Sequence, residues 1–404
     1  MKNKAWMVTL IVFCAGVTFS IGNFKVAPAM VDIIEEMDAN IALGGWLMSM
    51  SGLAGIILAL PAGAIMIKTG PKKLGMYTLA FALIGNIIGA VAPNFTILLL
   101  SRLIEGIGYG FIGIIAPAII AAWFPPRKLG LPMSIWSIWV PLGIFCVFNL
   151  SNLILPTFGW RGVWWLAASL FAAMMVLFGW GVQLPEEERG ENAEEKKARS
   201  SMMEGLKSFP SWLIAICFVS FAFGTNSLIT FAPTFLVEKL HMDGATANSV
   251  SSIFTLGNII GGLLMGIVLT KFRNRAYLLL ISMVSTAILM SFIFSLSTPG
   301  MVTPYMIIFG LVAAMFPAIA FTVAPETAPS PETIGIAIGI LILGQNVSNF
   351  ITPAIIGTVI ESSGGNWGAG TLPLIIAGIL GVIAALLFLK ESKQKEKSEI
   401  KVSR

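Results

Sequence analysis

Apolar stretches recur along the chain, each about 20 residues long and separated by shorter polar segments. A helix of about 20 residues is long enough to cross the hydrocarbon core of a bilayer. The alternating ten-residue pattern of a membrane β-barrel is not found in this sequence. The pattern therefore predicts an all-α membrane protein with twelve transmembrane helices. Their centres fall near residues 18, 55, 83, 109, 143, 172, 223, 258, 286, 315, 347 and 380.

The composition also indicates that most of the surface of the folded protein is in contact with lipid. Of the 404 residues, 56% are hydrophobic and 11% are charged. A soluble domain carries roughly 25% charged residues, so this chain has too few to cover a water-facing surface. A soluble chain of this length also usually divides into domains rather than forming one large core.

The start of the chain superficially resembles a signal peptide, because Met1–Lys4 is basic and an apolar run follows. That run continues for the length of a full span without a small-x-small cleavage site, which indicates an uncleaved first helix. Cys14, Cys146 and Cys217 all lie inside predicted spans. An odd number of cysteines in that position predicts neither a disulfide framework nor a metal cluster.

The distribution of basic residues predicts the orientation. With the N-terminus in the cytoplasm, all but four of the 25 lysines and arginines fall in cytoplasmic segments; the exceptions are Lys25, Arg102, Arg161 and Lys239. Both termini are therefore expected in the cytoplasm of a multi-pass protein of the plasma membrane, the inner membrane of a bacterium. The net charge of +5 is explained by this topology and by anionic lipid headgroups, so no nucleic-acid partner is expected.

The longest polar segment divides the chain in two. Residues 183–208 mix acidic and basic side chains with few apolar ones, as a solvated linker does. We predict an N-terminal six-helix bundle over 1–182, a cytoplasmic linker over 183–208, a C-terminal six-helix bundle over 209–390 and a cytoplasmic tail over 391–404. The halves are weak repeats, since a Gly-x4-Lys segment ends span two and recurs at the end of span eight.

Two sets of residues carry a family resemblance. The loop after span two fits G-x-x-x-D-R-x-G-R-K at Gly63, Lys68, Gly70, Lys72 and Lys73, with Ile67 and Pro71 as departures, and Lys271 matches the basic position in the second half. In span four, the run from Arg102 through Glu105 to Gly108 is similar to R-x-x-Q-G-x-G. The chain thus resembles the major facilitator superfamily, most nearly its cyanate-permease-like and organic-anion-symporter group.

This resemblance implies the major facilitator fold, transport by alternating access, and a gating role for the loop residues Gly63, Lys68, Gly70, Lys72 and Lys271. The fifth-span antiporter motif of the family survives only as Val140-Pro141-Leu142-Gly143. Its degradation favours proton-coupled uptake over exchange.

Ionisable residues inside spans cost roughly 2.5–3.5 kcal/mol each at a helix centre, which makes them functional candidates. Arg102, Glu105 and Tyr109 share one stripe of span four, beside a stripe formed by Gly106, Gly110 and Gly113. One interpretation is that Arg102 and Glu105 neutralise each other and brace the helix. The other is that Glu105 exchanges a proton while Arg102 modulates it or binds substrate.

Lys25 in span one also has two interpretations. It either reaches the headgroups or pairs with Asp32, or it faces a central cavity and attracts an anion. Arg102 enters span four at a similar depth, so the two cations are expected to converge. The second half offers amides in place of charges. Asn226, Gln345, Asn346 and Asn349 either hold helices together or supply neutral hydrogen bonds to a substrate.

The leading hypothesis is a secondary active transporter for a small, carboxylate-like organic anion, coupled to a proton or another ion. Lys25, Arg102, Tyr109 and the four amides are the predicted substrate ligands, and Glu105 is the predicted coupling acid. A phosphate loop, metal-ligand spacing and a nucleophile–base set are all missing from the sequence, so we expect no enzyme activity and no cofactor. A monomer is expected. The alternatives are a drug or amphiphile efflux pump and, less favoured, a non-transporting membrane sensor.

Overall fold

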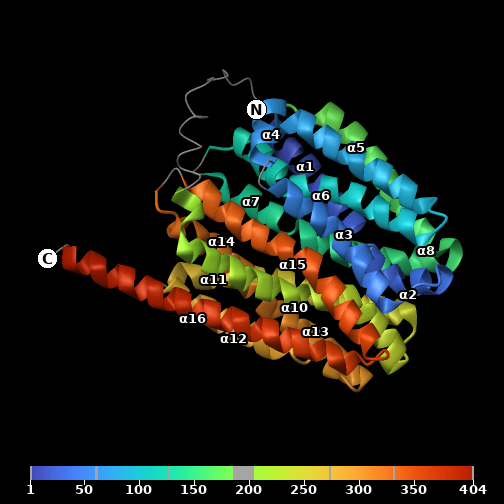
Figure 1. The fold of residues 1–404 in the computed structure, drawn as a ribbon. Helices are drawn as coiled ribbons and strands as arrows, with labels where there is room; N and C mark the ends of the chain where they lie inside the picture. The colour runs from blue at the N-terminus through green and yellow to red at the C-terminus, as the bar shows by residue number, and fades with distance from the viewer. Residues whose placement is uncertain are drawn as a thin grey trace. The chain divides into compact units, whose positions relative to one another are not determined.

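The computed structural model describes residues 2–59, 62–125, 128–184, 204–272, 274–330 and 333–402, and secondary structure in these ranges is entirely helical. Most of the predicted linker, residues 185–203, lies outside the described residues. The first half of the chain, blue to green in Figure 1, contains α1 (Lys2–Phe24), α2 (Val26–Glu36), α3 (Ile41–Ala59), α4 (Ala62–Thr69), α5 (Pro71–Ala90), α6 (Phe95–Trp123), α7 (Gly130–Ser137) and α8 (Trp139–Gly181).

The second half, yellow-green to red in Figure 1, contains α10 (Phe209–Leu240), α11 (Gly244–Lys271), α12 (Arg275–Met290), α13 (Pro299–Ala313), α14 (Met315–Val323), α15 (Ile334–Ser362) and α16 (Thr371–Val402). Short 3₁₀ turns cover Ile293–Ser295, Ala324–Thr327 and Trp367–Gly370. Large apolar side chains are exposed along many of these helices, as expected where lipid is the neighbour. Such a surface is that of a multi-pass membrane protein.

Eleven helical runs within the described ranges are long and apolar enough to cross a membrane. One of them, Gly130–Gly181, has 52 residues, roughly 78 Å of helix, which exceeds twice the hydrocarbon thickness of a bilayer. This run is broken at Gly159, whose φ of 60° and ψ of −170° are not helical. Glycine adopts this backbone conformation without a Cβ clash. The run is thus long enough for two of the twelve predicted passes.

Contacts divide the chain into two compact units, which we describe separately. Unit 1 comprises Met1–Glu187, Ile229–Thr255 and Asn349–Asn366; unit 2 comprises Glu188–Leu228, Leu256–Ser348 and Trp367–Arg404. Segments of α10, α11 and α15 therefore belong to unit 1 together with the first half of the chain.

Within unit 1, α6 lies at the centre and packs against α1, α3 and α5. The predicted small-residue stripe of α6 makes two of its expected close approaches. A Cβ on Gly106 would lie 2.6 Å from the carbonyl oxygen of Ser51, and one on Gly110 would lie 3.1 Å from Cα of Gly55. Gly113 has no neighbour within 4 Å of that position, so it is not part of the contact.

The end of α2 is fixed by a polar clamp. Glu36 accepts a hydrogen bond of 2.8 Å from Nε1 of Trp160 and forms an ion pair with Arg161. The Arg161 guanidinium also donates to the carbonyl of Ala92 and stacks 4.3 Å from the Trp160 ring centroid. These contacts hold α2 against α8. Because α2 begins directly after Lys25, they help to fix the position of that residue.

Candidate functional site

The first membrane helix is interrupted at Lys25, between α1 and α2. Proline at position 28 has no N–H, so the carbonyl of Phe24 loses the helical donor that residue 28 would supply. The final carbonyls of α1, including those of Gly22 and Asn23, form the negative end of the helix dipole. Cations are stabilised at such an end, and two of them lie here.

Arg102 of α6 is fully buried and caps these carbonyls with its guanidinium. Nη1 donates to the carbonyl of Gly22 at 3.0 Å, and Nη2 donates to the carbonyl of Asn23 at 2.7 Å. Nε donates to the carbonyl of Leu47 in α3 at 3.1 Å. The planar fork of arginine suits three acceptors at fixed directions. Arg102 therefore joins α6 to both α1 and α3.

Glu105, one turn further along α6, accepts from both cations through the same oxygen. Its Oε2 lies 2.5 Å from Nζ of Lys25 and forms an ion pair with Nη1 of Arg102. Nζ of Lys25 also donates to the carbonyl of Gly22 at 2.9 Å and lies 4.5 Å from the Trp164 ring centroid. When all three side chains are ionised, the cluster carries one net positive charge in a setting where charges must be paired to be tolerated.

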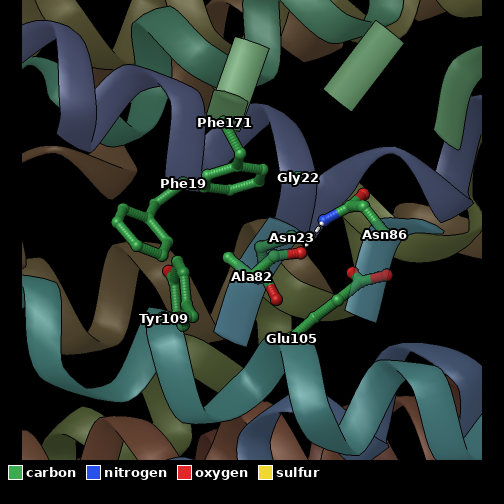
Figure 2. Close-up of a pocket in the computed structure, with 8 residues that line it drawn as sticks. All are labelled: Phe19, Gly22, Asn23, Ala82, Asn86, Glu105, Tyr109 and Phe171. Carbon is green, nitrogen blue, oxygen red and sulfur yellow. Dashed lines mark hydrogen bonds between the residues drawn. The ribbon is translucent and has the colours of Figure 1, made fainter. Parts of the chain in front are cut away.

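A small cavity adjoins this cluster and is lined by Phe19, Gly22, Asn23, Ala82, Asn86, Glu105, Tyr109 and Phe171 (Figure 2). The space is barely large enough for one water molecule. Figure 2 shows the Glu105 side chain rising from α6 towards Asn86 of α5. Oε1 of Glu105 and Oδ1 of Asn86 are both buried without a hydrogen-bond partner.

Aromatic rings enclose the cavity on its other side. Phe19 packs edge-on against Phe171 at 5.0 Å between ring centroids. The ring centroid of Tyr109 lies 6.4 Å from that of Phe24 and 5.9 Å from that of Trp139. Such packing excludes bulk water, and electrostatic interactions are stronger where water is excluded. A change in the charge of Glu105 therefore strongly changes its electrostatic interaction with the two cations.

The close approach of α5 to Glu105 depends on Gly85. A Cβ at this position would lie 2.7 Å from Cγ of Glu105 and 2.9 Å from its backbone nitrogen. Because backbone atoms move less easily than side-chain ends, a larger residue at position 85 would push α5 away from α6. Gly85 therefore positions Asn86 beside Glu105.

Four of the predicted site residues come together in unit 1: Lys25, Arg102, Glu105 and Tyr109. The predicted convergence of the two cations is confirmed, since both bind Glu105 and the carbonyl of Gly22. The interpretation that Lys25 reaches the headgroups or pairs with Asp32 is wrong, because its side chain is 0% exposed and bound to Glu105. The chain continues as helix through Val26–Glu36 after Lys25.

The predicted amides of the second half are divided between the units. Asn226 of α10 and both Gln345 and Asn346 of α15 belong to unit 2. Asn349 belongs to unit 1, where its backbone packs closely on Gly52 of α3. Their role as substrate ligands stays a prediction.

The predicted loop residues lie at helix ends. Gly63 and Lys68 belong to α4, and Lys68 is exposed in its last turn. Gly70 precedes α5 with a φ of 77°, a conformation that favours glycine, and Lys72 follows in the first turn. Lys271 is the exposed last residue of α11. Their gating role stays a prediction as well.

Sequence reasoning missed Asn23, Asn86 and Trp164, which complete the surroundings of the cluster. Pro28 was the available signal for the helix break that exposes the carbonyls of Gly22 and Asn23. Asn86 gave a weaker signal, because one amide in a membrane span is also a common link between helices. Among the described residues, no group of three His, Cys, Asp or Glu side chains could hold a metal ion.

Comparison with known proteins matches the chain to one superfamily and to several transport proteins. The model of the Major Facilitator Superfamily matches residues 8–247 and 213–403. The chain is 26% identical over 180 residues to the galactose-proton symporter of Escherichia coli (strain K12), covering 44% of this chain and 38% of that protein. It is 25% identical over 151 residues to the lincomycin resistance protein LmrB of Bacillus subtilis (strain 168), covering 37% of this chain and 31% of that protein. The chain thus aligns with well under two thirds of the length of these relatives.

A solved structure shares the fold along almost the whole chain. It is a bacterial homologue of the human lysosomal transporter Spinster, in an inward-facing and unoccupied conformation. The match covers 97% of this chain and 98% of that one, with a TM-score of 0.75 and 17% sequence identity. At that identity, the likeness concerns the fold alone.

Proposed function

Because the chain belongs to the Major Facilitator Superfamily, we propose that it is a secondary active transporter that carries a small, carboxylate-like organic anion across the plasma membrane by alternating access. The observation that carries this proposal is the buried cluster in which Lys25 and Arg102 share Glu105. Two cations held by one carboxylate leave a net positive charge that an anion can neutralise. This agrees with the organic-anion-symporter group that the motifs resemble.

Glu105 and the anion compete for the same cation. With Glu105 ionised, Lys25 is bound to it. A proton that binds Glu105 cancels its charge and releases Lys25, which then binds the carboxylate of the substrate. Arg102 stays bonded to the carbonyls of Gly22, Asn23 and Leu47 and supplies a fixed positive field. Proton and anion binding therefore favour each other, which is the linkage that symport requires.

The remaining predicted ligands have supporting roles in this proposal. Tyr109 lines the cavity beside Glu105. Asn226, Gln345, Asn346 and Asn349 provide neutral hydrogen bonds to the substrate when the site is loaded. Gly63, Lys68, Gly70, Lys72 and Lys271 act at helix ends during the change of access.

Transport by the purified protein tests the proposal directly. Proteoliposomes are screened with radiolabelled mono- and dicarboxylates, with and without an imposed proton gradient. The wild type is expected to accumulate an anion only with the gradient, and Lys25→Ala to lose that uptake. Glu105→Gln is expected to retain substrate exchange but lose gradient-driven accumulation. Unchanged anion uptake in Lys25→Ala overturns the role of Lys25, and intact accumulation in Glu105→Gln overturns the coupling role.

Efflux of amphipathic drugs is the second candidate, and the similarity to a lincomycin resistance protein favours it. This function needs an apolar binding surface and not a free cation. It therefore predicts that amphiphile export survives Lys25→Ala and that no carboxylate is accumulated. The same vesicles, loaded with a fluorescent amphiphile, distinguish the two candidates.

A further inference from the structure

The indole ring of Trp164 is buried beside the charged cluster with its N–H unpaired. Trp164 of α8 is 0% exposed, and its Nε1 has no hydrogen-bond acceptor among the described residues. A buried donor without an acceptor is destabilising, because it has given up its hydrogen bond to water. A phenylalanine or leucine side chain would fill an apolar site without that cost. A contact made by the ring itself should therefore offset it.

That contact is made by the face of the ring. Nζ of Lys25 lies 4.5 Å from the centroid of the Trp164 ring. A cation over an aromatic face is attracted by the negative potential of the π-electrons, and tryptophan attracts it most strongly. The attraction increases when both partners are withdrawn from water, and the side chains of Lys25 and Trp164 are both 0% exposed. Trp164 is thus a partner of Lys25 in addition to Glu105.

The ring is fixed in this orientation by two neighbours. Trp160, one turn earlier in α8, packs edge-on against it, with 5.3 Å between ring centroids and an interplanar angle of 85°. On α5, the missing side chain of Gly89 makes room for the edge that carries the N–H. A Cβ there would lie 2.3 Å from Nε1 and 2.4 Å from Cδ1 of Trp164. That edge of the indole therefore lies against α5, while a face of the ring is left for Lys25.

The three contacts of the Lys25 ammonium group differ in charge. Glu105 contributes a carboxylate at 2.5 Å, whereas the carbonyl of Gly22, at 2.9 Å, and the ring of Trp164 are neutral. A proton on Glu105 removes the charged partner and leaves the two neutral ones. Neutral partners hold an ammonium group without cancelling its charge. The Gly22 carbonyl also accepts from Arg102, so the ring is the neutral partner that Lys25 does not share with that cation.

We propose that Trp164 is a positioning residue that holds the Lys25 ammonium group at the anion-binding position while Glu105 is protonated. This inference rests on the proposed binding of a carboxylate by Lys25. Without the ring, the flexible side chain of Lys25 is held by one shared carbonyl, and the ammonium group spends part of its time out of reach of the substrate. Trp164 therefore sets the affinity for the anion rather than the rate of its translocation.

The hold of the ring on Lys25 is measured first without any substrate. Glu105→Gln removes the negative charge, as a proton does, and serves as the background. In this background, unfolding in lipid is followed by steric trapping for Trp164→Leu, Lys25→Met and the double variant. This double-mutant cycle gives the coupling between the two side chains. We expect a coupling of about tenfold to thirtyfold in the unfolding equilibrium constant, as a desolvated cation–π contact supports.

Fluorinated tryptophans separate the electrostatic role of the ring from its packing. Each added fluorine weakens the negative potential over the ring face, while the shape of the indole changes little. Mono-, di- and trifluorotryptophan at position 164 should lower stability in steps when Lys25 is present and have little effect in Lys25→Met. Trp136 is the matched control, since it stacks on Trp139 at 5.0 Å and none of the described cations lies over its ring.

Transport of radiolabelled acetate, benzoate and succinate then tests the link to substrate binding. In proteoliposomes with Glu105 intact, Trp164→Leu should raise KM by about thirtyfold and change kcat by less than about threefold. Trp164→Phe keeps an aromatic face and should recover most of the affinity. A purely structural role of the ring would not produce this split between KM and kcat.

The outcomes separate this inference from the proposed function. A coupling below about twofold in the Glu105→Gln background, or a fluorine series without a trend, overturns the role of Trp164 and leaves anion transport standing. A fall in kcat with unchanged KM also overturns it. Strong coupling in a protein that carries none of these anions overturns the proposed function and, with it, the effect of Trp164 on anion affinity.

Discussion

Buried polar groups are used differently in the two units. In unit 1, Lys25, Arg102 and Glu105 form ionic contacts between helices and join α1, α3 and α6. In unit 2, buried hydroxyls bond carbonyls. Ser282 bonds Leu279 within its own helix, and Ser220 of α10 bonds Ala377 of α16. The neutral contacts stabilise helices whatever the protonation state, whereas the charged contacts depend on one carboxylate. If Glu105 has the proposed coupling role, unit 1 is the part whose packing is expected to respond to a proton.

The largest expected effect comes from removing the shared carboxylate. Glu105→Leu leaves two buried cations facing each other without a counter-charge, which costs about 3–5 kcal/mol for a broken buried pair. The free energy of unfolding in lipid, measured by steric trapping, reports this loss. Lys25→Met in the same chain removes one cation and should recover part of the loss. Equal stability of the Glu105→Leu and Ser282→Ala proteins would contradict the contrast between the units.

Arg102→Lys is expected to have the next largest effect. An ammonium group keeps the charge but cannot bond the carbonyls of Gly22, Asn23 and Leu47 at once. The carbonyl of Gly22 keeps Lys25 as a donor, so the loss falls on the carbonyls of Asn23 and Leu47. A loss of about 2–3 kcal/mol follows from the cost of unpaired buried acceptors. Hydrogen exchange should show faster exchange near residues 22–26. Unchanged exchange there would show that the guanidinium does not hold the helix end.

Gly85→Ala should have a smaller but diagnostic effect. The added methyl group meets backbone and side-chain atoms of Glu105 at under 3 Å, so overpacking costs about 1–3 kcal/mol. Gly113→Ala is the matched control on the neighbouring helix, because nothing lies within 4 Å of its added methyl group. Melting temperatures of the two variants should therefore differ. Equal values would mean that α5 does not approach α6 this closely.

The smallest effect is expected in unit 2. Ser282→Ala removes a hydroxyl whose bond to Leu279 stays within one helix, and its net contribution is about 0.5–1.5 kcal/mol. Stability should change slightly and to the same extent at every pH, because no charge is involved. A strong pH dependence of this variant would remove the distinction between the charged and neutral units.

The sequence predicted the features that follow from the length of apolar runs and from the free-energy cost of burying charge. Spans were identified because apolar runs must match the bilayer, and the charged cluster was identified because buried charge is expensive. Of the two interpretations of Lys25, the one with Asp32 as its partner is wrong and the one in which it converges with Arg102 is confirmed. The contact of Lys25 is instead with Glu105, a residue of another helix 80 positions along the chain, which periodicity within the first span does not show.

Asn86 illustrates a different limit. Its place beside Glu105 at the cavity depends on how α5 packs against α6. Gly85 is similar, because only the packed structure shows what its missing Cβ would meet. Such residues become visible when neighbouring helices are in place, and periodicity alone does not reveal them.

The distance along the chain between Lys25 and Glu105 has a consequence for how the protein is made. Lys25 emerges from the ribosome 80 residues before its counter-charge. At about 5–20 residues per second, the first span waits roughly 4–16 s with a lone cation. During that time its insertion bears about 2.5–3.5 kcal/mol that no partner offsets. The charge of Lys25 is thus balanced only after span four is made, and variants at Glu105 are expected to appear first as poorly inserted nascent chains.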